Sequence, residues 1–288
     1  MLFDIAMKLA RKSLSQGFYN KISYDLLGRR RNYERIGTYA DIHRHYREHG
    51  ISFQGKNVVE VGAGLQYFTA LFFLADGASQ VTLVEPKLIF SAEELRRTLA
   101  AFNGHASRPR PLTEAEVRDR IQCFRDLSEV PRSMDGQADL LCSFTVLEHV
   151  HDLPGFFSES NRILKPGGCA YHMVDLSDHT YQVFARFRLL SGLNSSRALY
   201  HLRYSPGLFG VLNDPKCYMN RVLMPAYLDL AGKNGFTIVR KDTQPYPGKV
   251  KIHPRLLDEG ARDEEMLRIT TLSLTLEKTG AAAAARGA

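Results

Sequence analysis

The chain has 288 residues, of which 44% are hydrophobic and 24% charged, and its net charge at pH 7 is +7. This length fits one domain with an added segment, and the apolar content is ample for a sizeable core. No apolar run is long enough to span a bilayer, and Asp4 and Lys8 interrupt the apolar stretch that a secretory signal needs. The four cysteines have no paired short spacing, so we expect reduced thiols and a cytoplasmic protein.

Residues 1–50 form an N-terminal segment that reads as helical and carries ten Lys/Arg against five Asp/Glu. Its densest basic part is Gly28–Arg31. Such a segment could contact nucleic acid, an anionic membrane or an acidic carrier protein, but a solvated helix face is the simpler interpretation. The apolar spacing in residues 2–9 suits peripheral membrane contact, or packing on the domain or on a second subunit. The sequence does not separate these alternatives, and it leaves the oligomeric state open.

Beyond residue 50, short apolar strands alternate with amphipathic helices. Strands are expected at 57–61, 80–85, 121–124, 138–143, 169–174, 236–239 and 269–276. Helices are expected at 66–75, from Ser91 onward, at 153–163 and at 224–233. This alternation predicts an α/β fold with a doubly wound, mostly parallel, seven-stranded Rossmann-like sheet and an antiparallel edge strand.

The alternation is interrupted after the fifth strand. Residues 177–219 are rich in aromatic and basic side chains and contain no clear strand. We expect a helical insertion, whose aromatic residues form either a lid over a substrate or simply the insertion's own core. We therefore divide the chain into the N-terminal segment, a main domain at 51–279 and a low-complexity tail at 280–288 that is expected to be disordered.

The stretch from Val58 to Pro86 is the most informative part of the chain. Gly62 and Gly64 follow a β-branched strand at the point where it must turn into a helix and where a ligand can approach bare backbone. Glu85 ends the next strand about 20 residues later, where nucleotide-binding folds place the carboxylate that binds the ribose. Tyr67 occupies the position of the third glycine of a dinucleotide fingerprint. These features predict a nucleoside-type cofactor and argue against a nicotinamide dinucleotide.

From about Asn57 to Lys241 the chain resembles the class I S-adenosylmethionine-dependent methyltransferases, with their motifs in the same order. Glu60–Gly64 is similar to the Glu-x-Gly-x-Gly loop that takes the methionine half of the cofactor, and Leu164–Gly168 matches the turn before strand five. Gln66 departs from the family, which often has a third glycine there. The resemblance implies S-adenosylmethionine as cofactor and contacts from Glu60, Gly62, Ala63, Gly64, Gln66, Glu85, Pro86, Asp126, Leu127, Ser143 and Phe144.

Methyl transfer from a sulfonium is an in-line displacement, so the protein mainly aligns the acceptor, the methyl group and the sulfur. A hydroxyl acceptor also benefits from a general base. The run from His172 to His179 resembles a subgroup that carries His-x-x-Asp-x-x-Asp-His. We expect His179 to be the general base or an acceptor-orienting group, with Asp175 holding its tautomer; capping of loops and helices is the alternative for Asp175 and Asp178.

Glu148 and His149 follow the fourth strand. In the family's ubiquinone-type O-methyltransferases the corresponding Glu and His help bind a metal, together with another Glu three places earlier. Thr145 stands at that earlier place here, so we favour a turn that orders the cofactor loop and expect no metal. Substrate contacts are expected at His149, His172, Tyr204, Asn220 and Arg221. His172 is better interpreted as a partly buried strand residue than as a catalyst, and Arg221 could instead pair with Asp178.

The absence of two known motifs after the fourth strand narrows the class of methyl acceptor. The segment from Ser143 to Val146 has neither the proline pair of base-amino methyltransferases nor the Pro-Cys of pyrimidine carbon methylation. We therefore expect O-methylation of a small molecule, which could be a saccharide, a lipid or a secondary metabolite, and not a nucleic-acid acceptor. The alternatives are an RNA or protein methyltransferase that docks through the basic N-terminal segment, or a module that binds S-adenosylmethionine without turnover.

Overall fold

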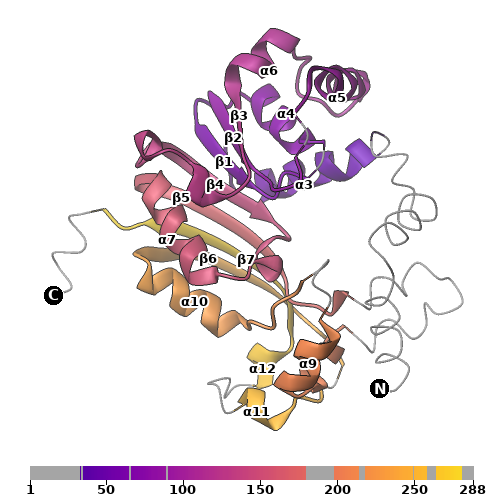
Figure 1. The fold of residues 1–288 in the computed structure, drawn as a ribbon, viewed down its shortest axis with the longest axis vertical. Helices are drawn as coiled ribbons and strands as arrows, with labels where there is room; N and C mark the ends of the chain where they lie inside the picture. The colour runs from indigo at the N-terminus through magenta and orange to yellow at the C-terminus, as the bar shows by residue number, and fades with distance from the viewer. Residues whose placement is uncertain are drawn as a thin grey trace, which may run out of the picture.

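A computed structural model describes residues 33, 35–64, 66–88, 90–179, 198–213, 218–248, 250–257 and 264–280. They form one seven-stranded sheet with helices on both faces (Figure 1). The strands are β1 (Asn57–Val61), β2 (Gln80–Val84), β3 (Ile121–Phe124), β4 (Ala138–Phe144), β5 (Leu164–Asp175), β6 (Phe236–Pro245) and β7 (Ile269–Lys278). The helices of three turns or so are α3 (Ile36–Glu48), α5 (Ala92–Gly104), α7 (Leu153–Ile163) and α10 (Met224–Lys233), and the shorter ones are α4 (Phe68–Ala75), α6 (Glu114–Arg120), α9 (Pro206–Leu212), α11 (Pro254–Leu257) and α12 (Glu264–Leu267).

The strand order is β3-β2-β1-β4-β5-β7-β6, and β1 to β5 are parallel. The order reverses between β1 and β4, so the connections after these two strands diverge and leave a crevice at their carboxyl ends, where open α/β sheets bind ligands. β7 is antiparallel, as expected, and it lies between β5 and β6. The outermost strand is therefore β6, and the antiparallel strand sits one place in from the edge.

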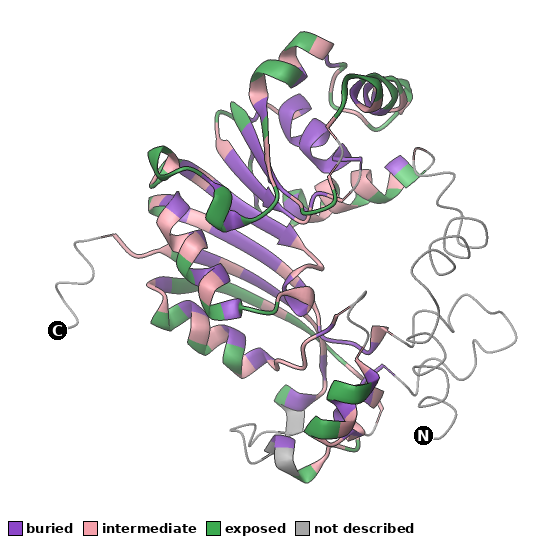
Figure 2. Ribbon diagram, in the orientation of Figure 1, coloured by how far each residue is buried: buried purple, intermediate pink, exposed green. Residues whose placement is uncertain are grey.

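Two apolar cores sandwich the sheet. The first packs side chains of α3, α4 and α5 against one face, around Tyr46, Phe68 and Phe102. The second packs α7 and α10 against the other face, around Phe157 and Tyr227. Figure 2 shows the buried strands at the centre of the described residues and the exposed β6 at the margin. Burial on both faces explains why β1 reads as a continuous apolar run apart from Glu60.

The helix starts predicted from the sequence follow from local capping. Ser91 Oγ accepts the backbone N–H of Glu94 at the start of α5, 3.1 Å away. Thr113 and Glu116 form a reciprocal capping box at the start of α6. These side chains satisfy backbone donors that a helix end leaves unpaired, so each helix begins where its cap stands.

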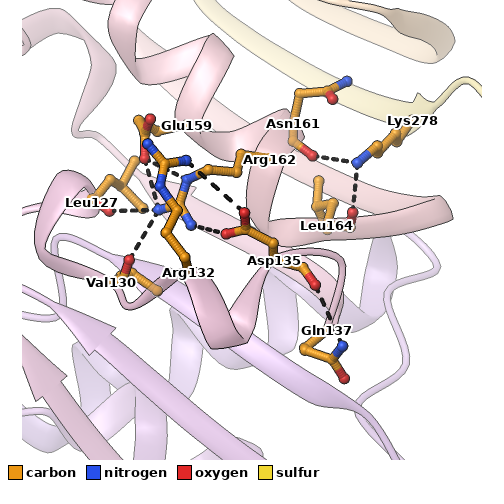
Figure 3. Close-up of polar contacts among 10 residues, drawn as sticks. All are labelled: Leu127, Val130, Arg132, Asp135, Gln137, Glu159, Asn161, Arg162, Leu164 and Lys278. Carbon is orange, nitrogen blue, oxygen red and sulfur yellow. Dashed lines mark hydrogen bonds and ion pairs between the residues drawn. The ribbon is translucent and has the colours of Figure 1, made fainter.

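The link between β3 and β4 is fixed by Arg162 of α7 (Figure 3). Its guanidinium donates to the carbonyl oxygens of Leu127 and Val130, 3.2 and 3.1 Å away, and pairs with Asp135 and Glu159. Figure 3 also shows Lys278 of β7, whose ammonium donates to the carbonyls of Asn161 and Leu164. The cofactor segment predicted after β3 is thus tied to α7, which packs in the same apolar core as Leu127 and Val130.

Three features differ from the expected pattern or lie outside it. β5 begins at Leu164, because Leu164 pairs with Ala138 before the register shifts, so it includes the predicted turn. Short helices α11 and α12 stand between β6 and β7, where no helix is expected from the sequence. Residues 1–32, 180–197, 214–217 and 281–288 lie outside the described residues. These undescribed ranges include the basic Gly28–Arg31, just over half of the predicted insertion and the predicted tail.

In the part of the insertion that is described, a 3-10 helix (Tyr200–Arg203) precedes α9. Across the described ranges no helix is both long enough and apolar enough to cross a membrane. The three cysteines of β3, β4 and β5 (Cys123, Cys142 and Cys169) are free thiols, as expected from their spacing.

Candidate active site

The glycine turn after β1 is shaped by close approach on two sides. Gly62 has φ +82° and donates its N–H to the carbonyl of Val84, 2.9 Å away. A Cβ on Gly62 would collide with a methyl group of Val146, so only glycine fits there. Gly64, at φ +70°, donates its N–H to Oε2 of Glu85 at 3.3 Å. The predicted ribose-binding acid therefore lies directly beside the predicted methionine-binding turn.

Glu60 lies beneath this turn and is buried. Thr69 of α4 donates its hydroxyl to Oε1 of Glu60, while Oε2 has no hydrogen-bond partner among the described residues. Burial raises the pKa of Glu60 to about 8, with Thr69 opposing and the charge of Glu85 adding to the shift. An unpaired buried carboxyl oxygen requires a partner. The ammonium group of S-adenosylmethionine would supply one, so the residues at this turn fit that cofactor.

The remaining predicted cofactor residues lie in the segments that follow β1, β2 and β3. The backbone N–H of Glu85 donates to the carbonyl of Phe124, 3.0 Å away, which aligns the ends of these two strands. Asp126 is exposed and caps a 3-10 helix (Leu127–Glu129) by accepting from Ser128. Pro86 is exposed, whereas Ala63, Gln66 and Leu127 are buried.

Ser143 and His172 are brought together, but inside the protein. Both are fully buried, and Ser143 Oγ is hydrogen-bonded to Nδ1 of His172 at 2.8 Å. Phe156 and Phe157 pack edge-on against the imidazole. Burial lowers the pKa of His172 to about 3, so the ring is neutral. This geometry favours the strand-residue interpretation of His172, and it directs the Ser143 side chain away from a ligand.

Thr145, which follows β4, has φ +54°. The left-handed region is strained for a β-branched residue, so the surrounding structure must hold Thr145 there. Its N–H donates to the carbonyl of Met173 on β5, 2.8 Å away. The turn that carries Val146, Glu148 and His149 is therefore anchored to β5 at its first residue.

His179 and Asp175 meet just beyond the carboxyl end of β5. Nε2 of His179 lies 3.3 Å from Oδ2 of Asp175, and both side chains are largely buried. Burial alone would raise the pKa of Asp175, but hydrogen bonds from His179 and Ser177 outweigh it and hold the pKa below its usual value. The imidazole thus faces an ionised carboxylate.

Glu148 and His149 complete a cluster with His179. One donor atom from each of the three side chains lies within 4.8 Å of the other two. Burial raises the pKa of Glu148 to about 8, against the effect of nearby backbone N–H groups and of His179, and neither carboxyl oxygen makes a well-aligned hydrogen bond with a described residue. His149 donates Nδ1–H to the carbonyl of Tyr218, which leaves the lone pair of the neutral ring on Nε2.

This donor set could hold a divalent metal. One carboxylate and two imidazoles suit first-row transition ions, and a carbonyl on the far nitrogen of a ligating His is a common orienting contact. In a tetrahedral site with metal–nitrogen bonds of about 2.0–2.1 Å, the ligand atoms would stand roughly 3.3 Å apart. The 4.0 Å between Nε2 of His179 and Oε1 of Glu148 would therefore have to shorten by roughly 0.7 Å for one ion to bind both. The Glu148-His149 motif lacks a third donor here, since Thr145 stands where the ubiquinone-type enzymes have another Glu. His179 supplies a third donor from a different segment.

Asn220 and Arg221 bind protein backbone. The amide of Asn220 donates to the carbonyls of Leu147 and Val150, 2.8 and 3.1 Å away, and so grips the turn that carries Glu148. Arg221 donates to the carbonyl of Tyr204 at 2.7 Å and lies over the ring of Phe209, 4.3 Å from its centroid. These contacts favour positioning roles for both residues. Tyr204, Phe209, Leu212 and Met219 form a small core of their own, so the Tyr204 side chain is buried.

Glu148, Thr145 and Tyr39 were not predicted from the sequence as contacts. Glu148 was compared with a metal-binding Glu and then interpreted as part of a turn, and Thr145 gave no signal of its own, because burial and backbone strain depend on the packed structure. The hydroxyl of Tyr39 would lie 3.3 Å from a Cβ on Gly64, but its apolar spacing with Ile42 and Tyr46 in the sequence says nothing about the glycine turn.

Comparisons with known proteins identify the family of the chain. A methyltransferase domain family matches residues 31–210, which is more than half of the chain. The chain belongs to this family: it is an S-adenosylmethionine-dependent methyltransferase of class I fold. A comparison with curated protein sequences finds no match.

Solved structures with a similar fold include two methyltransferases of low sequence identity. An S-adenosylmethionine-dependent methyltransferase from Mesorhizobium loti is 16% identical over 81% of this chain and 96% of its own, with a TM-score of 0.47. The geranyl diphosphate C-methyltransferase from Streptomyces coelicolor A3(2), solved with Mg²⁺, geranyl diphosphate and S-adenosyl-L-homocysteine, is 15% identical over 83% of this chain and 78% of its own, with a TM-score of 0.48.

Proposed function

We propose that the protein transfers the methyl group of S-adenosylmethionine to a hydroxyl oxygen of a small molecule, with His179 as general base. The observation that carries the proposal is the His179–Asp175 pair, 3.3 Å apart, at the carboxyl end of β5. This edge of the sheet also carries the glycine turn and Glu85, so acceptor and cofactor would meet there. On the cofactor side we assign the ribose to Glu85, the methionine ammonium to Glu60 and the adenine to Asp126 and Leu127.

The reaction needs little covalent help from the protein. The acceptor oxygen forms a bond to the methyl carbon as the carbon–sulfur bond breaks, and the sulfonium leaves as a neutral thioether. The hydroxyl proton passes to His179, and Asp175 stabilises the imidazolium that results. Since Asp175 faces Nε2, the neutral ring would accept the proton on Nδ1.

The acceptor class is inferred from the turn after β4 and from the insertion. Ser143 is engaged with His172, and no proline pair follows it, so the turn lacks the aromatic-and-amide platform of base-amino methyltransferases. The insertion at 177–219, which follows β5 directly in the sequence, is rich in aromatic residues. A saccharide, a lipid or a secondary metabolite fits this site. Docking of RNA or protein through the basic N-terminal segment, residues 1–50, is the alternative, and it predicts binding that falls steeply with salt and survives deletion of 176–217.

The test measures S-adenosylhomocysteine release with a panel of hydroxyl-bearing acceptors, chosen first from any molecule that mass spectrometry finds bound to the purified protein. His179→Ala should lower turnover by about 10²–10⁴-fold, the range expected of a general base, while S-adenosylhomocysteine affinity stays within about twofold. His105→Ala, at the end of α5, is the matched control and should retain turnover. Unchanged activity in His179→Ala would sink the assignment.

The cluster of Glu148, His149 and His179 favours a second candidate mechanism, in which a divalent ion assists. Glu148, His149 and His179 would hold the ion, which would supply Lewis-acid polarisation of the acceptor oxygen. The two mechanisms differ in their response to chelation. Base catalysis predicts turnover that survives exhaustive dialysis against a chelator. Metal assistance predicts loss of turnover, recovery with a transition ion, and one bound ion per chain by calorimetry that Glu148→Gln abolishes.

A further inference from the structure

Helix α3 precedes the Rossmann-like sheet in the chain, yet one of its side chains reaches the cofactor turn. A Cβ built on Gly64 would stand 3.3 Å from the hydroxyl oxygen of Tyr39. The Tyr39 ring packs against Phe68, the first residue of α4, with the ring centroids 5.4 Å apart. The Tyr39 hydroxyl therefore lies beside Gly64, and its ring is positioned by Phe68.

The chemical state of this hydroxyl is set by its surroundings. Burial raises the pKa of Tyr39, Arg35 opposes the shift, and the charges of Glu60 and Glu85 add to it. The phenol is therefore a protonated donor at physiological pH. No hydrogen bond joins its oxygen to another residue in the described ranges, although it lies close to Gly64.

The cofactor carries a single anionic group, the methionine carboxylate. An anion is stabilised at the N-terminus of a helix, and α4 begins at Phe68, directly after the turn. The acidic side chain of Glu85, beside the turn, would repel a carboxylate unless a donor intervened. We propose that Tyr39 is that donor, and that its hydroxyl binds the methionine carboxylate of S-adenosylmethionine.

The N-terminal segment does not end before the catalytic domain, because α3 completes the cofactor site from outside the strand–helix alternation. The family match agrees in extent, since it begins at residue 31, ahead of α3. The proposal rests on the cofactor and is independent of the acceptor and of His179.

The experiment compares Tyr39→Phe with Tyr33→Phe by calorimetry. Tyr33 offers a matched control, since its ring also packs on Phe68, 6.3 Å away, but its hydroxyl donates to Glu94 of α5 at 2.9 Å. Each variant is titrated with S-adenosylhomocysteine and with 5′-deoxy-5′-methylthioadenosine, which lacks the amino-acid end. Thermal unfolding of the ligand-free proteins is recorded in parallel.

Tyr39→Phe should weaken S-adenosylhomocysteine binding about tenfold or more, as expected for a lost hydrogen bond to a charged group, and leave the methylthioadenosine affinity within about twofold. Tyr33→Phe should lower the melting temperature and leave both affinities unchanged. The proposal would be overturned if Tyr39→Phe weakened the binding of both ligands equally, or if it left the binding of S-adenosylhomocysteine unchanged. Failure of the wild-type protein to bind S-adenosylhomocysteine would instead overturn the cofactor assignment on which it rests.

Discussion

Asp175 holds His179 with one carboxylate oxygen and is itself held by the other. Oδ2 faces Nε2 of His179 at 3.3 Å, while Oδ1 accepts from the backbone N–H and the hydroxyl of Ser177, 2.9 and 2.6 Å away. The carboxylate therefore cannot rotate without losing two hydrogen bonds. Such a fixed anion selects one imidazole tautomer and stabilises the imidazolium, which is what a proton-accepting histidine needs.

Asp175→Asn should keep the shape of this pair but remove its charge. We expect turnover to fall by about 100-fold or more, because the amide can stabilise neither the imidazolium nor the required tautomer. S-adenosylhomocysteine affinity should stay within about twofold. The measurement is the pH profile of turnover together with calorimetry, and the ascending limb should move to lower pH in the variant than in the wild-type protein, because the imidazolium loses the carboxylate that stabilises it. Ser177→Ala, which removes only one of the two donors to Oδ1, is the control and should lose far less. A pH profile that does not move would contradict the assignment.

The fold and the cofactor half of the site were predictable because their signals are local. The Glu85–Gly64 contact follows from one strand–helix–strand unit, whose geometry fixes how far along the chain the second strand must end. Ser91 and Thr113 mark helix starts by capping, which depends on three or four neighbouring residues.

The acceptor half was less predictable because its geometry arises from contacts between distant segments. Glu148 is buried by segments distant in the sequence, among them that of Asn220, whose backbone N–H donates to the carbonyl of Glu148. Thr145 acquires its strained backbone only through β5. The sequence of β7 alternates apolar and polar residues, as an edge strand would. Its place between β5 and β6 is set by how the chain folds back after β6. No local period encodes any of these.

Glu60 and Glu148 should make the ligand-free protein less stable as pH rises. Burial raises the pKa of each to about 8, above the ordinary value of 4.5 that applies in the unfolded chain. Between these values the folded protein binds a proton that the unfolded chain has released, so the free energy of unfolding falls as pH rises through this window. Glu60→Gln removes the titration and keeps an acceptor for Thr69.

Urea unfolding at pH 5 and pH 8 checks this prediction. Glu60→Gln should be about 1–3 kcal/mol more stable than wild type at pH 8, with a much smaller difference at pH 5. Glu116→Gln is the control of opposite sign, since its hydrogen bond from the Thr113 backbone holds the pKa of that carboxyl below its usual value. That variant should gain nothing at pH 8. An equal gain for Glu60→Gln at both pH values would show that the carboxyl group is not protonated in the folded protein.

Arg162 should support both stability and the adenine end of the cofactor site. Its side chain is largely buried, and it binds the carbonyls of Leu127 and Val130 as well as Asp135 and Glu159 (Figure 3). Arg162→Met keeps the apolar stem but leaves these groups unpaired, which should cost about 1–3 kcal/mol in the free energy of unfolding. Arg132→Met, which removes an exposed guanidinium 3.9 Å from the same Asp135, should change stability by less than about 0.5 kcal/mol.

The same variant distinguishes the two ends of the cofactor. Since Arg162 fixes the segment of Asp126 and Leu127, Arg162→Met should weaken S-adenosylhomocysteine and 5′-deoxy-5′-methylthioadenosine to a similar extent, by several-fold, because both ligands carry the adenine. Tyr39→Phe should affect only the former. Calorimetry at a temperature well below the melting point of the variant separates this effect from partial unfolding. If Arg162→Met lowers stability but leaves both affinities unchanged, Arg162 supports the fold alone, and the adenine must bind away from the segment that begins at Asp126.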